Sequence, residues 1–435
     1  MSVLDARMLR APKLSFDPAI PSRTSMHAYQ GLRQYGPFDS SQVYLPDHSV
    51  LFVFPESLRV LARKLVMALG RGHQTFPGFG QMFRVPFTND HIESLVIQGD
   101  FSSPSAAASS YRDEIARWNS ESHLTDPKLA LVLVPHSERW ETERPYYEAK
   151  ASFARLGIPT QMVTAELLQN DREFTWSVAN IALAVFAKLG GVPWVVESPS
   201  NDQDLVIGIG RAEVRGSTGS RRIFGYALSF TSNGVYRQTW SFTPTADEET
   251  YLERLEEAVT SALTSTREAD EPFRRLVIHL GKRTGWREAV AARSAMTNAG
   301  ITLPLALMRL DDSSLYDIAD GRADTLAPPK GIAVRLGGRQ MLLQSEGVST
   351  TGAPSGPLLI ELDERSDVGP ESLEDLVSQT FRLAHANWRA FNARSQPVTL
   401  VYGELLARLV GYLEEVATWD PTLLRNDLRD RPWFL

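Results

Sequence analysis

Residues 129–134 read Leu-Ala-Leu-Val-Leu-Val, and residues 145–157 read Pro-Tyr-Tyr-Glu-Ala-Lys-Ala-Ser-Phe-Ala-Arg-Leu-Gly. The first run is apolar without interruption and has strand length, which is typical of a strand buried on both faces. The second run begins with proline and ends with glycine, the residues that favour the first turn and the end of a helix. A buried strand followed by a helix is the unit of a parallel sheet, so this stretch predicts an α/β fold.

The same alternation continues on both sides of this stretch. Residues 49–54 form another apolar run, and an amphipathic pattern follows over about 55–70. Downstream, a short strand is expected near 161–163 and a helix over about 175–189. We therefore predict a Rossmann-like domain, in which helices cover both faces of a parallel sheet.

The pattern changes after Pro199, where three strand candidates follow one another with short loops between them. The expected segments are strands 204–210, 222–230 and 234–242, helix 248–264, strand 275–280, helix 285–299, strand 303–310, and long helices over 371–394 and 404–417. Three antiparallel strands and then alternating helices and strands is the element order of a ribonuclease-H-like fold. A second domain is thus predicted, with the boundary near residue 193.

Composition limits the classes of function. The 435 residues favour two domains, and the formal net charge of −7 argues against coating nucleic acid through bulk electrostatics. The chain has no cysteine, which excludes disulfides and thiol nucleophiles and fits a cytosolic protein. No signal peptide is expected, because Asp5 and Arg7 interrupt the N-terminal segment. No membrane span is expected, because Lys188 and Pro193 interrupt the apolar stretch 178–196.

Four side chains are candidates for an anion site. Tyr146 and Lys150 share a face near the start of one expected helix, where unpaired backbone amides favour an anion. Gln161 follows in the next strand, and Lys188 ends the next helix. A phosphate could take two ammonium groups, an amide donor and a phenol there, and Tyr146 could stack on a base. On spacing alone, a partly buried ring and solvated lysines remain the commoner alternative.

Three motifs bear on that choice: Tyr146-Tyr-Glu-Ala-Lys150, Gly157-Ile-Pro-Thr-Gln161, and Asn180 followed by Lys188-Leu-Gly-Gly-Val-Pro-Trp194. Together they resemble the MID domain of Argonaute and Piwi proteins, in which the matching residues hold the 5′ end of a guide strand. The resemblance implies a 5′-phosphate and base site formed by Tyr146, Lys150, Gln161 and Lys188, with Asn180 near the same phosphates.

The C-terminal residues Arg431-Pro-Trp-Phe-Leu435 are similar to the buried C-terminus of that family. The resemblance implies that the Leu435 carboxylate reaches the phosphate site and helps to hold a divalent cation, for which Mg²⁺ is the expected ion. One position departs from the pattern. Where the most similar family member has an amide metal ligand, four residues before Lys188, this chain has Ala184.

The resemblance extends along the whole chain. Residues 31–38 are similar to the N-terminal arm of short prokaryotic Argonautes, and Asn387-Trp-Arg389 and Pro397-Val-Thr-Leu400 are similar to PIWI landmarks. That short class contains only MID and PIWI domains. The expected organisation is an arm over 1–38 that packs on PIWI, a MID domain over 39–192 and a PIWI domain over 193–435.

A cleaving PIWI domain needs clustered carboxylates that hold two Mg²⁺ ions. At the place of the first carboxylate this chain has Gly210, and after the strand 276–279 it has Gly281 in place of an acid. Glu404 falls near the fourth position, but one carboxylate cannot hold two cations. No nuclease activity is therefore expected from this polypeptide.

The remaining motifs give weaker evidence of function. Gly208-Ile-Gly210 does not fit a dinucleotide fingerprint, because Glu213 stands where the third glycine belongs. The histidines show no metal-binding spacing, and His279 is expected to be a hydrogen-bonded structural residue. Six basic residues are candidates for a duplex channel, or for ordinary surface charge: Arg221, Arg222, Lys282, Arg283, Arg389 and Arg394.

The resemblance implies a catalytically inactive short Argonaute that acts in prokaryotic defence against invading DNA. It would bind a short RNA guide, recognise complementary DNA, and work with a partner that carries an APAZ region and an effector. Base pairing would read the sequence, while the protein reads the backbone and the end. Two alternatives remain open: a homodimeric nucleic-acid-binding protein, and an enzyme with an unrelated active site on the same fold.

Overall fold

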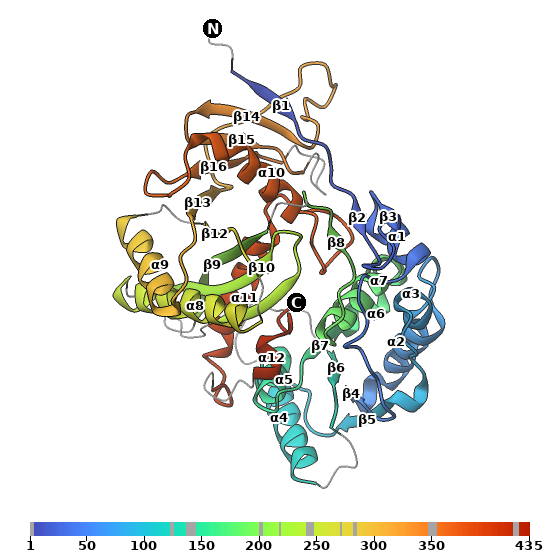
Figure 1. The fold of residues 1–435 in the computed structure, drawn as a ribbon. Coiled ribbons are helices and arrows are strands. Elements are labelled where there is room, and N and C mark those ends of the chain that lie inside the picture. Colours follow the sequence, from blue (N-terminus) through green and yellow to red (C-terminus); the bar gives the residue numbers. More distant parts are fainter. Residues whose placement is uncertain are drawn as a thin grey trace.

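The computed structural model describes residues 4–121, 126–135, 145–199, 203–216, 219–240, 248–269, 272–281, 285–346, 355–420 and 426–435. These residues form two α/β units, each built on its own sheet, which lie side by side (Figure 1). A search of the described helices finds none with the length and apolarity needed to cross a membrane.

The first unit contains a four-stranded parallel sheet in the order β5-β4-β6-β7. Its strands are β4 (Val50–Pro55), β5 (Ile92–Ile97), β6 (Leu129–Val134) and β7 (Thr160–Thr164). Leu129 and Leu131 of β6 face α2 (Arg59–Arg71) and α7 (Asp171–Lys188), whereas Ala130 and Val132 face α4 (Pro104–Ser120) and α5 (Pro145–Arg155). The prediction of a strand buried on both faces is confirmed.

The second unit contains a nine-stranded sheet in the order β1-β14-β15-β16-β13-β12-β9-β10-β11. Its strands after residue 203 are β9 (Asp204–Gly216), β10 (Gly219–Thr231), β11 (Tyr236–Trp240), β12 (Arg275–Leu280), β13 (Leu305–Asp311), β14 (Ile332–Gly337), β15 (Gln340–Leu343) and β16 (Leu358–Leu362). The strands β9, β10 and β11 are antiparallel neighbours, whereas β12 and β13 run parallel to β9. This is the predicted ribonuclease-H-like order, and that prediction is confirmed.

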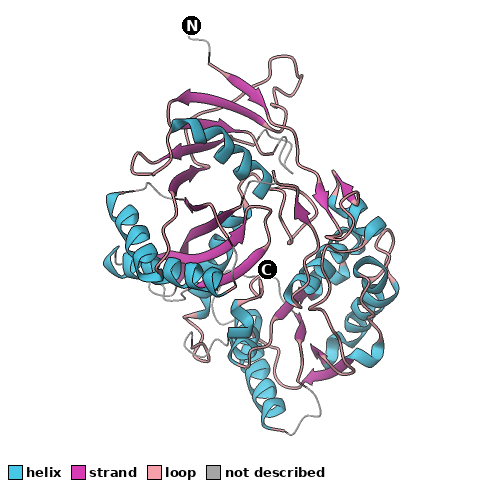
Figure 2. Cartoon of the chain, in the orientation of Figure 1, coloured by secondary structure: helices cyan, strands magenta, loops and turns pink. Residues whose placement is uncertain are grey.

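Helices cover both faces of the nine-stranded sheet (Figure 2). They are α8 (Glu248–Glu268) and α9 (Trp286–Ala299) on one face, and α10 (Leu373–Leu383) and α11 (Val398–Leu413) on the other. Leu205 and Ile207 of β9 point to the first pair, and Val206 points to the second pair. The alternation along β9 therefore fixes which helices lie on which side.

The helix expected over 371–394 is shorter than predicted, because α10 ends at Leu383. Beyond it, the Asn387 side chain donates to the carbonyl of Asn392 at 3.0 Å and accepts from the Arg389 amide at 3.2 Å. Such local side-chain bonds compete with helix formation and close a turn here.

The helix expected over 404–417 begins earlier than predicted. It is α11, which starts at Val398 directly after Pro397 and ends at Leu413. Its first turn contains β-branched residues of low helix propensity, so packing against β9 decides its start.

The N-terminal arm contacts both units. Strand β1 (Ala6–Met8) extends the nine-stranded sheet at β14, and β2 (Leu14–Ser15) pairs with β3 (Thr24–Ser25) and β8 (Val195–Val196). Helix α1 (Ala28–Tyr35) then packs on α3 (Phe79–Phe83) in the first unit. The arm thus contacts the second unit, on which it was predicted to pack, and its helix α1 also contacts the first unit.

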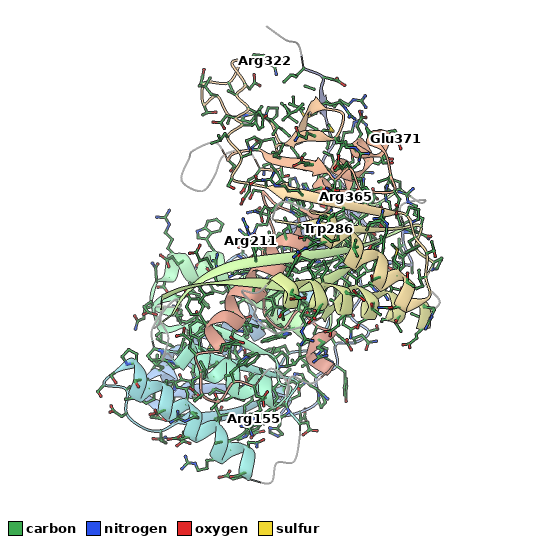
Figure 3. The ribbon with its side chains drawn as sticks, turned by 90° about the vertical axis from the view of Figure 1, so that its left-hand side faces the viewer. Arg155, Arg211, Trp286, Arg322, Arg365 and Glu371 are labelled. Carbon is green, nitrogen blue, oxygen red and sulfur yellow. The ribbon has the colours of Figure 1, made fainter. Side chains whose placement is uncertain are left out.

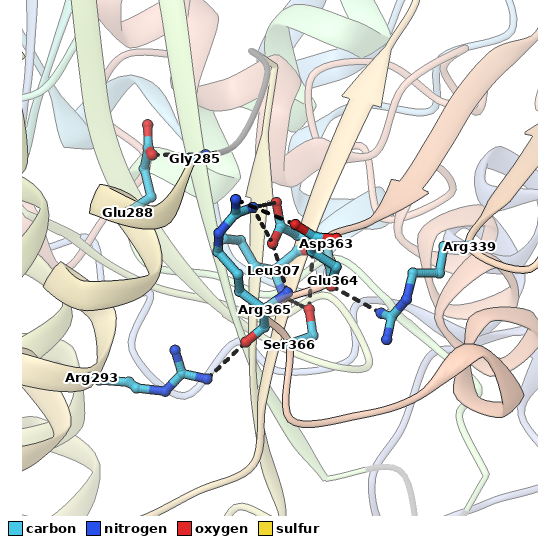
Figure 4. Close-up of polar contacts among 9 residues, drawn as sticks. All are labelled: Gly285, Glu288, Arg293, Leu307, Arg339, Asp363, Glu364, Arg365 and Ser366. Carbon is cyan, nitrogen blue, oxygen red and sulfur yellow. Dashed lines mark hydrogen bonds and ion pairs between the residues drawn. The ribbon is translucent and has the colours of Figure 1, made fainter.

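The turn after β16 is hydrogen-bonded to α9, to Leu307 of β13 and to Arg339 before β15 (Figure 4). Arg365 pairs with Asp363 at 3.1 Å, and Arg339 donates to the Asp363 carbonyl at 3.0 Å. Arg293 of α9 donates to the Arg365 carbonyl and to the Asp367 carboxylate, each at 2.7 Å. These bonds hold α9 to the turn that follows β16.

One buried carboxylate joins β9, β12 and α10. Asp204 accepts from Arg274 at 3.0 Å, from Arg275 at 2.5 Å and from Gln379 at 2.8 Å, and its side chain is fully buried. Each of its partners comes from a segment distant in sequence, so the network fixes the start of β9.

Replacing Asp204 should strongly destabilise the second unit. Asp204→Ala leaves the buried Arg275 guanidinium without its counter-charge, a loss of about 3–5 kcal/mol. This loss of stability is measured as a lower melting temperature, with thermal unfolding monitored by circular dichroism. Asp320→Ala, which removes a pair with the exposed Arg322 and an acceptor for the Arg322 amide, is the control and should lower the melting temperature far less. Equal melting temperatures for Asp204→Ala and wild type would contradict the assignment.

Candidate functional site

A cavity of about 250 Å³ lies where the two units meet. The first unit lines it with residues of α5, β7 and α7, and the second unit with the turn at residue 389, α11 and the C-terminal residues. Among the lining residues are Tyr146, Lys150, Gln161, Asn180, Ala184, Arg389, Arg408 and Leu435. The sequence-predicted residues Tyr146, Lys150, Gln161, Asn180 and Leu435 are thus brought together.

Lys188 lies directly behind this lining. Its ammonium donates to Gln161 Oε1 at 2.6 Å, and Gln161 Nε2 donates to the Met162 carbonyl at 3.1 Å. The Gln161 amide therefore helps to position Lys188. Its nitrogen has a second hydrogen, so the donation to a phosphate stays a prediction.

Both lysines are buried. Lys150 is 2% exposed and donates to Thr160 Oγ1 at 3.3 Å, and Lys188 is 0% exposed. Burial lowers the pKa of Lys188 well below its usual range, and the charges of Lys150 and Arg389 lower it further. Burying an amine among other cations costs free energy, which is characteristic of a site that binds an anion.

Tyr146 is the aromatic residue of the cavity. Its ring is half-buried, the Lys150 ammonium lies 5.8 Å from its centroid, and its ring packs edge-on against Tyr147 at 5.1 Å. Tyr147 in turn stacks on Tyr412 of α11 at 5.1 Å. The stack joins the two units immediately beside the cavity.

Sequence reasoning missed two arginines. Arg389, which was considered for a duplex channel, lines this cavity, and so does Arg408 of α11, which was not singled out. Both come from the second unit. Their positions depend on where α11 and the preceding turn pack, so no local pattern reveals them. Of the other channel candidates, Lys282 and Arg283 lie outside the described residues, as do the side chains of Arg221 and Arg222.

The predicted first carboxylate position is closed by packing. A Cβ on Gly210 would lie 2.0 Å from the Gly403 carbonyl carbon and 2.1 Å from the Glu404 nitrogen. A Cβ on Gly208 would lie 2.0 Å from the Thr399 oxygen. Strand β9 and helix α11 therefore cross backbone against backbone, which leaves no space for a side chain at residue 210.

The surroundings of Gly281 differ, because a Cβ there would meet nothing within 4 Å. Burial, and then the neighbouring Asp312, raise the pKa of Glu404 to about 7, while Arg408 and Arg211 oppose that rise. Arg211 lies on the exposed side of β9 (Figure 3). Among the described residues, no group of three or more acidic or histidine side chains could hold a metal ion.

His279 has the structural surroundings expected of it. Its Nδ1 pairs with Thr399 Oγ1 at 2.9 Å, and burial lowers its pKa to about 3. The imidazole is therefore neutral at physiological pH and links β12 to α11.

The chain is similar to known proteins in sequence. A Piwi domain is recognised over residues 132–289. The chain is 25% identical to the argonaute protein of Cereibacter sphaeroides over 99% of this chain and 59% of that protein. It is 23% identical to the Piwi protein of Archaeoglobus fulgidus over 68% of this chain and 73% of that protein.

Two solved structures share the fold. One is Clostridium butyricum Argonaute bound to a guide DNA and a 19-mer target DNA, with a TM-score of 0.71 and 18% identity over 95% of this chain. The other is Drosophila Piwi, with a TM-score of 0.69 and 18% identity over 99% of this chain. The chain spans 54% and 56% of those two chains, about half of their length.

Replacing the buried amine of Lys188 should stabilise the empty protein. A lysine whose pKa is lower in the folded chain than in the unfolded chain weakens folding as the pH falls below the unfolded value of about 10.4. Lys188→Met should therefore raise the melting temperature at pH 7 and reduce its dependence on pH between about 7 and 10. The exposed Lys128 provides the control, Lys128→Met. A less stable Lys188→Met protein at pH 7 would contradict the assignment of a strained cation site.

Proposed function

The chain belongs to the Argonaute/Piwi family, and on that premise we propose that its cavity anchors the 5′-phosphorylated end of a guide strand. The proposal rests mainly on the observation that several cationic side chains come together in one cavity. Lys150 of the first unit meets Arg389 and Arg408 of the second in one cavity, with Lys188 directly behind. The chain as a whole carries a net charge of −7, so this local concentration of positive charge is specific to the site.

A terminal phosphate suits this cavity better than an internal one. A terminal phosphate monoester carries about −1.5 to −2 charges near neutral pH, whereas an internal diester carries one. The buried amines gain most from the more highly charged group, because attraction is strong where water is excluded. The phosphate would also raise the pKa of Lys188, so that binding takes up a proton when this amine is neutral in the empty cavity.

The donor set does not fit a divalent cation held by the protein alone. Among the described residues that line the cavity, none has an acidic side chain, the Gln161 oxygen accepts from Lys188, and Ala184 offers no ligand. The cationic side chains already supply charge opposite a phosphate. We therefore propose that phosphate binding does not require Mg²⁺, and that the predicted metal role of Leu435 is secondary.

We further propose that the protein recognises a complementary target without cleaving it. Support comes from the crossing of β9 and α11, which leaves no space at Gly210 for a metal-binding carboxylate. Burial, and then the neighbouring Asp312, raise the pKa of Glu404 to about 7, while Arg408 and Arg211 oppose that rise.

If this chain does not cleave the target, a separate effector would have to act once the target has been recognised. The resemblance to short prokaryotic Argonautes leads us to propose an APAZ-containing effector partner and a role in defence, with an RNA guide and a DNA target. A stable homodimer remains the second candidate. The mass of the purified complex separates the two, since a stoichiometric second polypeptide favours the effector and a dimer of identical chains favours the alternative.

Removing both buried amines should abolish recognition of the 5′ end. In Lys150→Ala/Lys188→Ala the affinity for a 5′-phosphorylated oligonucleotide should fall by about 10²- to 10⁴-fold, since each charge-assisted contact contributes about 1.5–3 kcal/mol. Affinity for the 5′-hydroxyl form should change little. Fluorescence anisotropy on both oligonucleotides measures this, with exposed Lys128→Ala/Lys330→Ala as control. Equal affinity of wild type for the two ends would refute the proposed function.

Restoring an acid at residue 210 should not create a nuclease. Gly210→Asp places a side chain into the backbone of α11, so the melting temperature should fall, and no cleavage of a labelled target should appear with Mg²⁺ or Mn²⁺. Gly281→Asp, which enters open space, should leave stability unchanged. Metal-dependent cleavage by the wild-type chain that is lost in Glu404→Ala would contradict the proposed absence of catalysis.

A further inference from the structure

Trp176 is a large aromatic residue left 74% exposed on α7. A tryptophan side chain usually contributes most when buried, so its exposure calls for an explanation other than stability. Elsewhere α7 is packed tightly: Phe174, Val178 and Phe186 are each 0% exposed. The helix therefore hides its other large apolar side chains and presents this ring alone.

The position of Trp176 relates it to the cavity. Asn180 and Ala184, four and eight residues further along α7, both line the cavity, as does the adjacent Ser177. Residues four apart form one ridge along a helix, and each step of four spans about 6 Å. Side chains on a helix lean toward its N-terminus. The ridge thus leads from the cavity wall at Ala184, past Asn180, to the exposed ring.

Charges around the ring favour a base over a phosphate. Arg172, one turn before Trp176, is exposed and forms no ion pair within the part of the chain that the structure describes. Glu173 beside it is also exposed, and its carboxylate opposes close approach of a phosphate at this point. A neutral, flat base avoids that repulsion and has a π-face for the indole.

The aromatic residue inside the cavity is engaged differently. The Tyr146 ring has the Lys150 ammonium 5.8 Å from its centroid and Tyr147 packed against it at 5.1 Å. Trp176 has no such partner among the described residues, and its ring is open to solvent. The two aromatics therefore suit different parts of one strand, Tyr146 at the terminus and Trp176 further out.

We propose that the exposed part of this ridge, Arg172 and Trp176, is a nucleobase-binding site outside the phosphate cavity, where Trp176 stacks on a base that follows the 5′-terminal nucleotide. This inference rests on the proposed function, because the strand reaches the ring only if its 5′ phosphate lies in the cavity. It adds a sequence-tolerant contact that holds the first nucleotides beyond the anchored end.

Oligonucleotide length separates this site from the cavity. Affinities of wild type, Trp176→Ala and Trp176→Phe are measured by calorimetry for uridine 5′-monophosphate and for a 5′-phosphorylated tetranucleotide. Trp176→Ala should weaken tetranucleotide binding by about 5- to 150-fold and leave mononucleotide binding unchanged, and Trp176→Phe should restore most of the loss. Trp286→Ala, which removes an exposed ring of the second unit (61% exposed), is the matched control.

An abasic tetranucleotide series identifies the contacted base. Removing the stacked base should weaken binding to wild type by the same factor as Trp176→Ala, and should cost nothing further in that variant. Unchanged tetranucleotide affinity in Trp176→Ala, or equal losses for mononucleotide and tetranucleotide, would overturn the inference. Failure of the proposed function has a different signature, namely no preference of wild type for a 5′ phosphate. Melting temperatures confirm that each variant is folded.

Discussion

The backbone crossing of β9 and α11 is the constraint on which the rest of the structure depends. Glycines at 208 and 210 let the helix lie directly on the central strand. Because α11 lies so close, its outer side delivers Arg408 to the cavity and places Tyr412 on Tyr147. The contact that leaves no space for a side chain at residue 210 thus also places Arg408 in the lining of the cavity.

The cavity is shaped for a ligand at the expense of the empty protein. Lys150 and Lys188 are almost fully buried, and Lys188 donates to the neutral oxygen of Gln161. Replacing a buried charged group with an apolar side chain is often neutral or stabilising. Asp204 offers a comparison, because its buried carboxylate is matched by two arginines and a glutamine. Its charge is internally satisfied, as a structural network requires.

Much of the fold was predictable because the pattern of apolar residues along the chain indicates which segments form strands and helices. The run 129–134 alternates between two cores, and the order of strands after residue 203 specifies the second sheet. The motifs around Tyr146, Gln161 and Lys188 located the site. Other features depend on tertiary packing: α11 begins at Val398 because β9 holds it, and Arg408 reaches the cavity for the same reason. The engagement of Gln161 with Lys188 likewise has no local signature.

The cavity wall is divided between the two units, and this division has a mechanical consequence. A strand end bound there would contact Lys150 of the first unit and Arg408 of the second. It would therefore strengthen the interface between the units, to which the Tyr147–Tyr412 stack and the Thr418–Glu148 hydrogen bond already contribute. Any ligand that binds only the assembled interface shifts the equilibrium away from open forms. Without such a ligand, the two units are held at this interface by contacts between their own residues, such as the Tyr147–Tyr412 stack and the Thr418–Glu148 hydrogen bond.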